Sequence, residues 1–146
     1  MNQTISSGGT DNHLLLWDAR PLSLTGSKLE KALSACAITA NKNSLLGDVS
    51  AQNPGGVRLG TPALTSRGMK PDDMEQVAKF LMQAASAATS VELLCRQEGT
   101  GGSKDGKVTT QQFCEKLKSD KDGIFRGIRD KVERFSSSFY MPGQEI

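Results

Sequence analysis

The sequence has little of what most catalytic and metal sites are built from. Its 146 residues include one histidine, three cysteines, one tryptophan and one tyrosine. An odd number of widely spaced cysteines favours buried reduced thiols over a disulfide framework or a zinc site. Lysine and arginine number 18 against 16 aspartates and glutamates, and the formal net charge of +2 gives no bulk attraction to nucleic acid. We therefore expect no metal site, no disulfide scaffold and no nucleic-acid partner.

Long hydrophobic runs are also missing. The longest, Leu14–Trp17, has the size of a strand, whereas a membrane helix needs about 18 apolar residues. The first residues carry neither a basic cluster nor an apolar stretch, so we expect no secretory signal and no membrane association. A cytoplasmic location is the default expectation, with mitochondrial and plastid forms left open. Hydrophobic residues make up 36% of the chain, which is enough for one domain with a core.

The sequence does contain short runs that are typical of strands. Residues 1–10 are polar and contain glycines, and we expect a flexible leader there. Strands are predicted at the apolar run from Leu14, at residues 38–41, and at residues 57–60, where apolar and polar side chains alternate. With a helix between the first two strands, this order predicts an α/β domain of the α+β type. Its small, mostly antiparallel three-stranded sheet would be covered by helices on one face.

Apolar residues at spacings of three and four predict the helices. The segment Ser27–Glu30 fits a capping box and predicts a helix over residues 28–37. A long helix is predicted after Pro71, a short one after a second capping-box sequence at Thr109–Gln112, and a last one that closes before Pro142. Residues 98–108 are rich in glycine and predict a mobile loop, which lacks the ending of a phosphate-binding loop.

Few side chains stand out as candidates for chemistry. His13 has no metal-ligand spacing around it, so we interpret it as a hydrogen-bonded residue at a strand edge rather than a ligand or base. Arg58 lies between apolar and small residues, so its guanidinium needs a partner. The residues alone leave two interpretations of Arg58 open. It grips a substrate carboxylate through two parallel hydrogen bonds, or it pairs with one of the chain's own acids.

Six segments, in order along nearly the whole chain, resemble the C-terminal domain of serine hydroxymethyltransferase, also called glycine hydroxymethyltransferase. They are Gly8–Leu14, Thr25–Lys31, Asn41–Asn43, Gly47–Ser50, Pro54–Gly68 and Met141–Gly143. The block PGGVRLGTPALTSRG at residues 54–68 is the most specific of them. The resemblance implies the small domain of a fold type I pyridoxal-phosphate enzyme.

Such an enzyme is a transferase of one-carbon metabolism, which converts serine and tetrahydrofolate to glycine and methylenetetrahydrofolate. In the family a large domain carries the Schiff-base lysine and the cofactor phosphate site, and the enzyme is a homodimer or tetramer. No segment of this sequence resembles that large domain, so we expect residues 11–146 to be the small C-terminal domain alone. The chain would then be a fragment with no catalytic residues, no bound pyridoxal phosphate and no activity by itself.

The resemblance assigns site residues only where the motifs match. The family's substrate-carboxylate arginine falls on Arg58. Its folate-contacting asparagine falls on Asn43, and Lys42 and Ser44 lie beside that site in the sequence. The implied ligands are therefore serine or glycine at Arg58 and tetrahydrofolate at Asn43.

Other matches and two departures complete the comparison with the family pattern. Arg67 and residues 11–13 also match, and we give them structural roles. Leu46 stands where the family usually has proline, which predicts a less rigid loop after Asn43. Residues 98–107 look longer than the family norm.

We also expect an exposed apolar face where the large domain would pack. The alternative function is a non-catalytic module of the same fold that binds carboxylate or folate.

Overall fold

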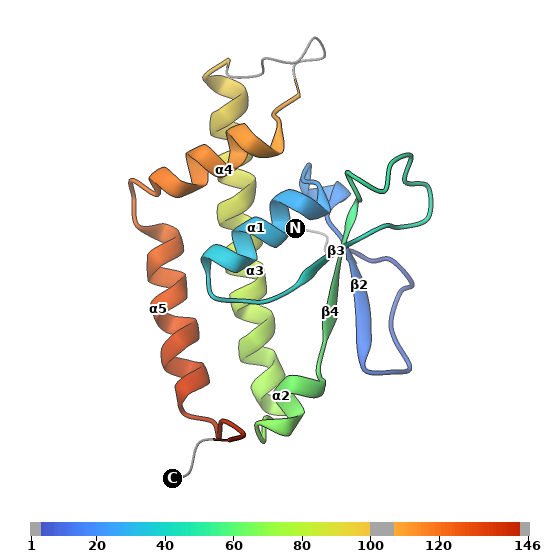
Figure 1. Ribbon diagram of the computed structural model, residues 1–146, viewed down its shortest axis with the longest axis vertical. Coiled ribbons are helices and arrows are strands. Elements are labelled where there is room, and N and C mark those ends of the chain that lie inside the picture. Colours follow the sequence, from blue (N-terminus) through green and yellow to red (C-terminus); the bar gives the residue numbers. More distant parts are fainter. Residues whose placement is uncertain (1–3, 100–106, 144–146) are drawn as a thin grey trace.

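The computed structural model describes residues 4–99 and 107–143, and it contains the antiparallel sheet that the sequence predicts. Strands β1 (Thr4–Ile5), β2 (Leu14–Asp18), β3 (Asn41–Asn43) and β4 (Gly56–Gly60) lie in the order β1-β2-β4-β3. Each neighbouring pair is antiparallel. The long helices lie on one side of this sheet, so the expected fold class is confirmed (Figure 1).

The sheet has four strands where three were predicted, because β1 is added, and one of the predicted strands is displaced. β1 falls within the expected leader and pairs with the end of β2, Ile5 opposite Trp17, and two residues are too few to show an alternating pattern. The strand expected at residues 38–41 starts at Asn41 instead. Ile38 is used to close the preceding helix, because its N–H donates to the Leu33 carbonyl at 2.9 Å after a left-handed residue at position 37.

The helices are α1 (Gly26–Ala35), α2 (Pro62–Ser66), α3 (Pro71–Gln97), α4 (Thr110–Ser119) and α5 (Ile124–Ser137), with a 3-10 turn at Arg20–Leu22. Four of the helices confirm the predicted periodic segments, whereas α2 and the 3-10 turn were not predicted. The capping box at Thr109 and Gln112 is present. The predicted mobile loop at residues 98–108 lies mostly outside the described residues. None of the helices in the described ranges combines the length and hydropathy of a membrane span.

The first helix begins earlier than its predicted capping box. Thr25 is the N-cap, and its hydroxyl accepts from the Lys28 N–H at 3.3 Å. Ser27 is buried inside the first turn instead. The reason is Gly26, whose N–H donates to the Pro54 carbonyl at 2.8 Å where the helix start touches the sheet. A β-carbon on Gly26 would lie 2.0 Å from the Gly56 oxygen, so only glycine allows this approach.

The hydrophobic core lies between the sheet and the helices. Leu29 and Leu33 of α1, Val57 of β4 and Phe113 of α4 are fully buried there. The C-terminal helix contributes three buried residues, Phe125, Ile128 and Val132, so its apolar stripe belongs to the core as predicted. One ion pair is buried with them.

That ion pair joins α1 to α3. The Lys28 Nζ lies 2.7 Å from the Glu92 Oε2, and both side chains are at most 5% exposed. The other Glu92 oxygen faces Arg96 at 3.2 Å, and the Lys28 ammonium sits 5.9 Å from the centre of the Phe113 ring. Each charge therefore has a partner in the core, which a buried ion pair requires.

Candidate functional site

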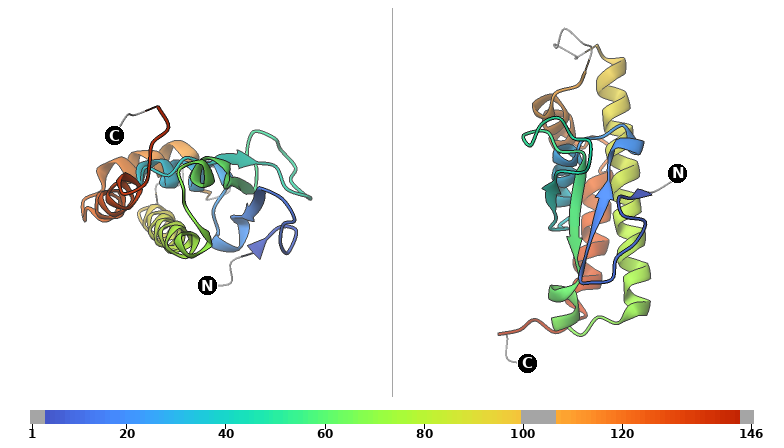
Figure 2. Two further views of the ribbon diagram at one scale, coloured as in Figure 1. Left: turned by 90° about the horizontal axis from the view of Figure 1, so that it is seen from below. Right: turned by 90° about the vertical axis from the view of Figure 1, so that its right-hand side faces the viewer.

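Two of the predicted site residues, Arg58 and Asn43, lie on the face of the sheet that no described helix covers, here called the open face. Residues directly opposite each other in neighbouring strands share a face. Leu16 and Asn41 are both opposite Arg58, and Asn43 is opposite Gly56, so all of them share that face. The helices pack against the other face, and the right-hand view of Figure 2 shows strands β2 and β4 in front of helix α5.

Arg58 places a positive charge on the open face. It is exposed at the centre of β4, between β2 and β3. Among the described residues, no acidic side chain lies within the 4 Å of an ion pair with Arg58. The internal salt bridge that the sequence left open is therefore not seen in the described part of the chain. The guanidinium stands on a rigid strand and is available to an external partner.

Asn43 lies at the end of β3, two positions along the ladder from Arg58. That separation corresponds to about 7 Å along the strands. Its side chain is half-buried, and its Nδ2 donates to the Ser44 carbonyl at 2.8 Å. Leu14 and Leu16 of β2 are half-buried on the same face, which therefore combines a cation, amides and an apolar border.

Lys42 does not share this face. It is opposite Val57, so its side chain leaves the strand on the side of the helices, and its N–H donates to the Glu30 carboxylate at 3.0 Å. Ser44 follows Asn43 directly and is exposed. The structure thus brings Arg58 and Asn43 to one face, keeps Ser44 next to them, and places the Lys42 side chain on the opposite side of the edge strand.

A charged cluster holds the loop at residues 44–55, which connects β3 to β4. The Asp48 Oδ2 accepts from the Leu45 N–H at 2.8 Å and from the Gly55 N–H at 2.7 Å. These two bonds join the ends of the loop across one carboxylate. The Gly55 and Leu45 N–H groups, in that order, lower the pKa of Asp48 below its usual value.

Arg20 links this loop to the end of β2. Its guanidinium binds Asp18 through Nε and Nη2, with a shortest distance of 2.8 Å. The Nη1 donates to the Leu46 carbonyl at 3.2 Å and lies 3.5 Å from the Asp48 Oδ1. The hydrogen bonds from Arg20 lower the pKa of Asp18, against the opposing effect of burial. Sequence reasoning missed this cluster, because residues 18, 20 and 48 form no recognisable spacing.

Arg67 has the structural role that the sequence suggested. Its Nε donates to the Tyr140 carbonyl at 3.1 Å, and its Nη2 donates to the carbonyls of Phe139 and Ser136. These carbonyls lie at and beyond the C-terminal end of α5. The guanidinium therefore ties the turn after α2 to the end of the last helix, where a cation also interacts favourably with the helix dipole.

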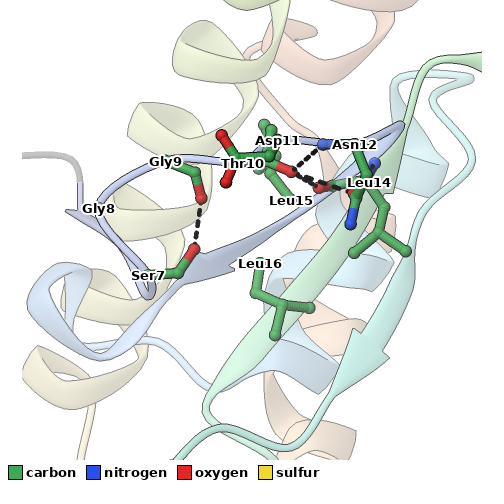
Figure 3. Close-up of a pocket in the computed structure, with 9 residues that line it drawn as sticks. All are labelled: Ser7, Gly8, Gly9, Thr10, Asp11, Asn12, Leu14, Leu15 and Leu16. Carbon is green, nitrogen blue, oxygen red and sulfur yellow. Dashed lines mark hydrogen bonds between the residues drawn. The ribbon is translucent and has the colours of Figure 1, made fainter.

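A shallow hollow lies between β2 and the loop that connects β1 to β2 (Figure 3). Its lining includes Leu14 and Leu16, which belong to the open face. The polar side chains around it bind their own loop. The Thr10 hydroxyl donates to the Leu14 carbonyl, and the Asn12 carboxamide oxygen accepts from the Leu14 N–H at 3.0 Å. The His13 carbonyl accepts from the Thr61 N–H at 3.0 Å. These contacts fit the structural interpretation of residues 11–13.

The cysteines are free thiols, as predicted. Cys36 and Cys95 are buried, and burial raises the pKa of both, to about 11 for Cys36. Cys114 is half-buried, which differs from the expectation that all three are buried. In the described ranges no three His, Cys, Asp or Glu side chains come together as a metal site.

No lysine is a strand partner of Arg58 in the described ladders. A pyridoxal-phosphate site needs a lysine that can form a Schiff base. The neighbours of Arg58 on the open face are Leu16 and Asn41. Lys28 is held in the core by Glu92, and Lys42 leaves the sheet on the other face. Neither of these two lysines therefore lies beside Arg58 on the open face.

Comparison with known proteins agrees with these observations. A family model described as serine hydroxymethyltransferase matches residues 1–81. Serine hydroxymethyltransferase 4 of Arabidopsis thaliana is 43% identical over 139 residues, which are 95% of this chain and 27% of that protein. The cytosolic enzyme of Oryctolagus cuniculus is 41% identical over 141 residues, again 95% of this chain and 27% of the relative.

A relative from another compartment is similar too. Serine hydroxymethyltransferase 3, chloroplastic, of Arabidopsis thaliana is 38% identical over 143 residues, which are 94% of this chain and 25% of the relative. The chain thus spans 25–27% of the length of these curated relatives. Their names cover cytosolic and chloroplastic proteins, so the family is compatible with either compartment. The chain belongs to the serine hydroxymethyltransferase family.

Proposed function

We propose that this chain acts as the small domain of a serine hydroxymethyltransferase. The enzyme transfers the one-carbon unit of serine to tetrahydrofolate and forms glycine and methylenetetrahydrofolate. The observation that carries the proposal is the exposed Arg58 on the open face, without an acidic partner among the described residues and on the same face as Asn43. Membership of the family supplies the reaction.

Arg58 would hold the carboxylate of serine or glycine. Its planar guanidinium can donate two parallel hydrogen bonds to a carboxylate, and a lysine ammonium cannot reproduce that geometry. β4 is flanked by β2 and β3, so the backbone of Arg58 is fixed by ladders on both sides. A substrate held in this way is oriented before the reaction, which lowers the entropic part of the barrier.

Asn43 would bind the folate. A carboxamide both donates and accepts hydrogen bonds, and the edge of a pteridine ring presents both kinds of group. Ser44 lies next to it and is a second candidate for a folate contact. Lys42 is proposed only as a neighbour of this site, because its side chain leaves the opposite side of the edge strand.

Pyridoxal phosphate would be held by a part of the enzyme other than the described residues. When bound, it withdraws electrons from the substrate bonds that are broken and formed. We propose that a large cofactor-binding domain packs against the open face and that the complete enzyme is a homodimer or tetramer. This chain alone is expected to give no Schiff-base absorbance with pyridoxal phosphate and no turnover.

The test uses a hybrid enzyme in which this chain replaces the matching region of Serine hydroxymethyltransferase 4 of Arabidopsis thaliana. We expect the hybrid to convert serine to glycine. Arg58→Ala should lower kcat/KM for serine by about 100-fold, and Arg58→Lys by at least about tenfold, because hydrogen bonds between charged groups are lost. The matched control is Arg126→Lys on the exposed side of α5, which should leave kcat/KM unchanged.

An active hybrid whose kcat/KM for serine does not respond to either Arg58 variant would overturn the carboxylate role. The folate role is tested separately by Asn43→Ala. This variant should raise the KM for tetrahydrofolate by about tenfold, as one or two hydrogen bonds are removed. Asn53→Ala is the control, because Asn53 is exposed in the same loop.

A further inference from the structure

The position of Asn43 depends on a weak strand. β3 has three residues and lies at the edge of the sheet, where it pairs only with β4. The loop at residues 44–55 that follows it is much longer than the roughly two to five residues of a usual hairpin loop. A short edge strand before a long loop frays readily unless other contacts hold it. Asn43 is the last residue of this strand.

Asp48 supplies such contacts at both ends of the loop. One of its oxygens accepts from the N–H groups of Leu45 and Gly55, at 2.8 and 2.7 Å. Leu45 follows Asn43 by two residues, and Gly55 precedes β4 by one. A single carboxylate thus holds the chain just after Asn43 to the chain just before the strand that carries Arg58.

Packing reinforces this arrangement. The Leu45 side chain is buried against Gly56, where an added β-carbon would lie 2.7 Å from the leucine methyl group. A β-carbon on Gly55 would lie 2.7 Å from the Asp48 Oδ1. The two glycines therefore leave the space that the leucine and the carboxylate occupy. By contrast, the Leu46 and Val49 side chains extend fully into solvent. The side-chain packing that holds the loop is therefore at its two ends.

Arg20 fixes the carboxylate from the side of β2. It is held by Asp18 through two nitrogens and reaches the Leu46 carbonyl and Asp48 with its third. The loop is thereby connected to the strand that pairs with β4. We call Asp48 and Arg20 together the loop clamp.

We propose that the loop clamp positions Asn43 for the folate, so that Asp48 and Arg20 are positioning residues of the enzyme. The inference rests on the proposed function, because it assigns to Asn43 the folate contact argued above. The contacts of Asp48 and Arg20 hold the loop that follows Asn43, and neither residue belongs to the strand pair of Arg58 and Asn41. The clamp should therefore affect folate binding at Asn43 more than carboxylate binding at Arg58.

The first test measures amide hydrogen exchange by NMR in this chain. In Asp48→Ala, the amides of Leu45 and Gly55 should exchange at least about fivefold faster, because each loses its acceptor. Asp48→Asn keeps one oxygen for them and should give a smaller increase, and it serves if the alanine variant does not fold. Asp130→Ala, an exposed acid on α5, is the matched control. Amides of α3 should keep their rates in all variants.

The second test measures steady-state kinetics in the hybrid enzyme. Asp48→Ala and Arg20→Ala should raise the KM for tetrahydrofolate by about tenfold and change the KM for serine by less than about twofold. Equal changes in both KM values, or unchanged Leu45 and Gly55 exchange, would overturn the clamp. If Asn43→Ala itself leaves the KM for tetrahydrofolate unchanged, the proposed function fails. If Asn43→Ala raises it and the clamp variants do not, only the clamp fails.

Discussion

At the scale of single residues, the close approach of α1 to the sheet depends on Gly26. The N-terminus of α1 meets the sheet there, and a β-carbon would lie 2.0 Å from the Gly56 oxygen and 2.9 Å from the Gly56 carbonyl carbon. Neither atom can move aside, because both belong to the backbone of β4. The contact also supports the site, since Gly56 is opposite Asn43 in the ladder.

Gly26→Ala is therefore expected to lower the free energy of unfolding by about 3 kcal/mol or to prevent folding. Gly127→Ala is the matched control, because nothing lies within 4 Å of its added β-carbon near the N-terminal end of α5. That change should raise the free energy of unfolding by about 0.5–1 kcal/mol through helix propensity. Urea denaturation measures both. Equal stability of the two variants would contradict the close approach.

The carboxylates of the charged cluster predict how stability depends on pH. Asp18 and Asp48 have lowered pKa values in the folded chain, through Arg20 in the first case and the Gly55 and Leu45 N–H groups in the second. Their stabilising contribution is complete above the unfolded pKa of about 3.9 and is lost as the pH falls through the lower folded values. Acid should therefore weaken the fold in part through these two groups.

We expect the free energy of unfolding to fall less between about pH 6 and about pH 3 in Asp18→Asn and in Asp48→Asn than in the unchanged chain. Urea titrations at several pH values measure this difference. Asp130→Asn on α5 should follow the unchanged chain. Parallel curves for all four proteins would show that the carboxylates of the cluster do not contribute.

At the scale of elements, the buried pair of Lys28 and Glu92 joins α1 to α3. Removing Lys28 leaves the buried Glu92 with only the half-exposed Arg96 as its partner, so Lys28→Met should lower the free energy of unfolding by about 3 kcal/mol. The double change of Lys28→Met with Glu92→Leu should recover much of that loss. Glu133→Ala, which breaks the exposed pair with Arg129, should cost less than about 0.5 kcal/mol.

Urea denaturation of these variants tests the pair. A loss for Lys28→Met as small as that for Glu133→Ala would mean that the pair is not isolated from water. A double variant as unstable as the single one would mean that packing rather than charge sets the cost.

The elements also show what the sequence could and could not predict. The periodic helices α3 and α5 were predictable, because their apolar residues recur at helical spacing over many turns. β1 and the true start of α1 were not, because both depend on contacts with distant strands. Arg58 and Asn43 were identified through the family motif, and their common face follows from the strand register. The loop clamp depends on contacts between residues 20 and 48, which no local pattern records.

At the scale of the whole molecule, the sheet separates two kinds of surface. One face is filled by the helices and forms the core, whereas the open face presents Arg58, Asn41 and Asn43 beside Leu14 and Leu16. This asymmetry supports the proposal that another part of a serine hydroxymethyltransferase packs against the open face and completes the site. The chain spans only 25–27% of its curated relatives, which leaves room for that part.

The most direct test is a crystal structure of the hybrid enzyme with pyridoxal phosphate and glycine bound. We predict that both carboxylate oxygens of the glycine accept hydrogen bonds from the Arg58 guanidinium, at the roughly 2.7–2.9 Å of charge-assisted bonds. A glycine carboxylate held by another residue, with Arg58 pointing away from it, would contradict the central claim.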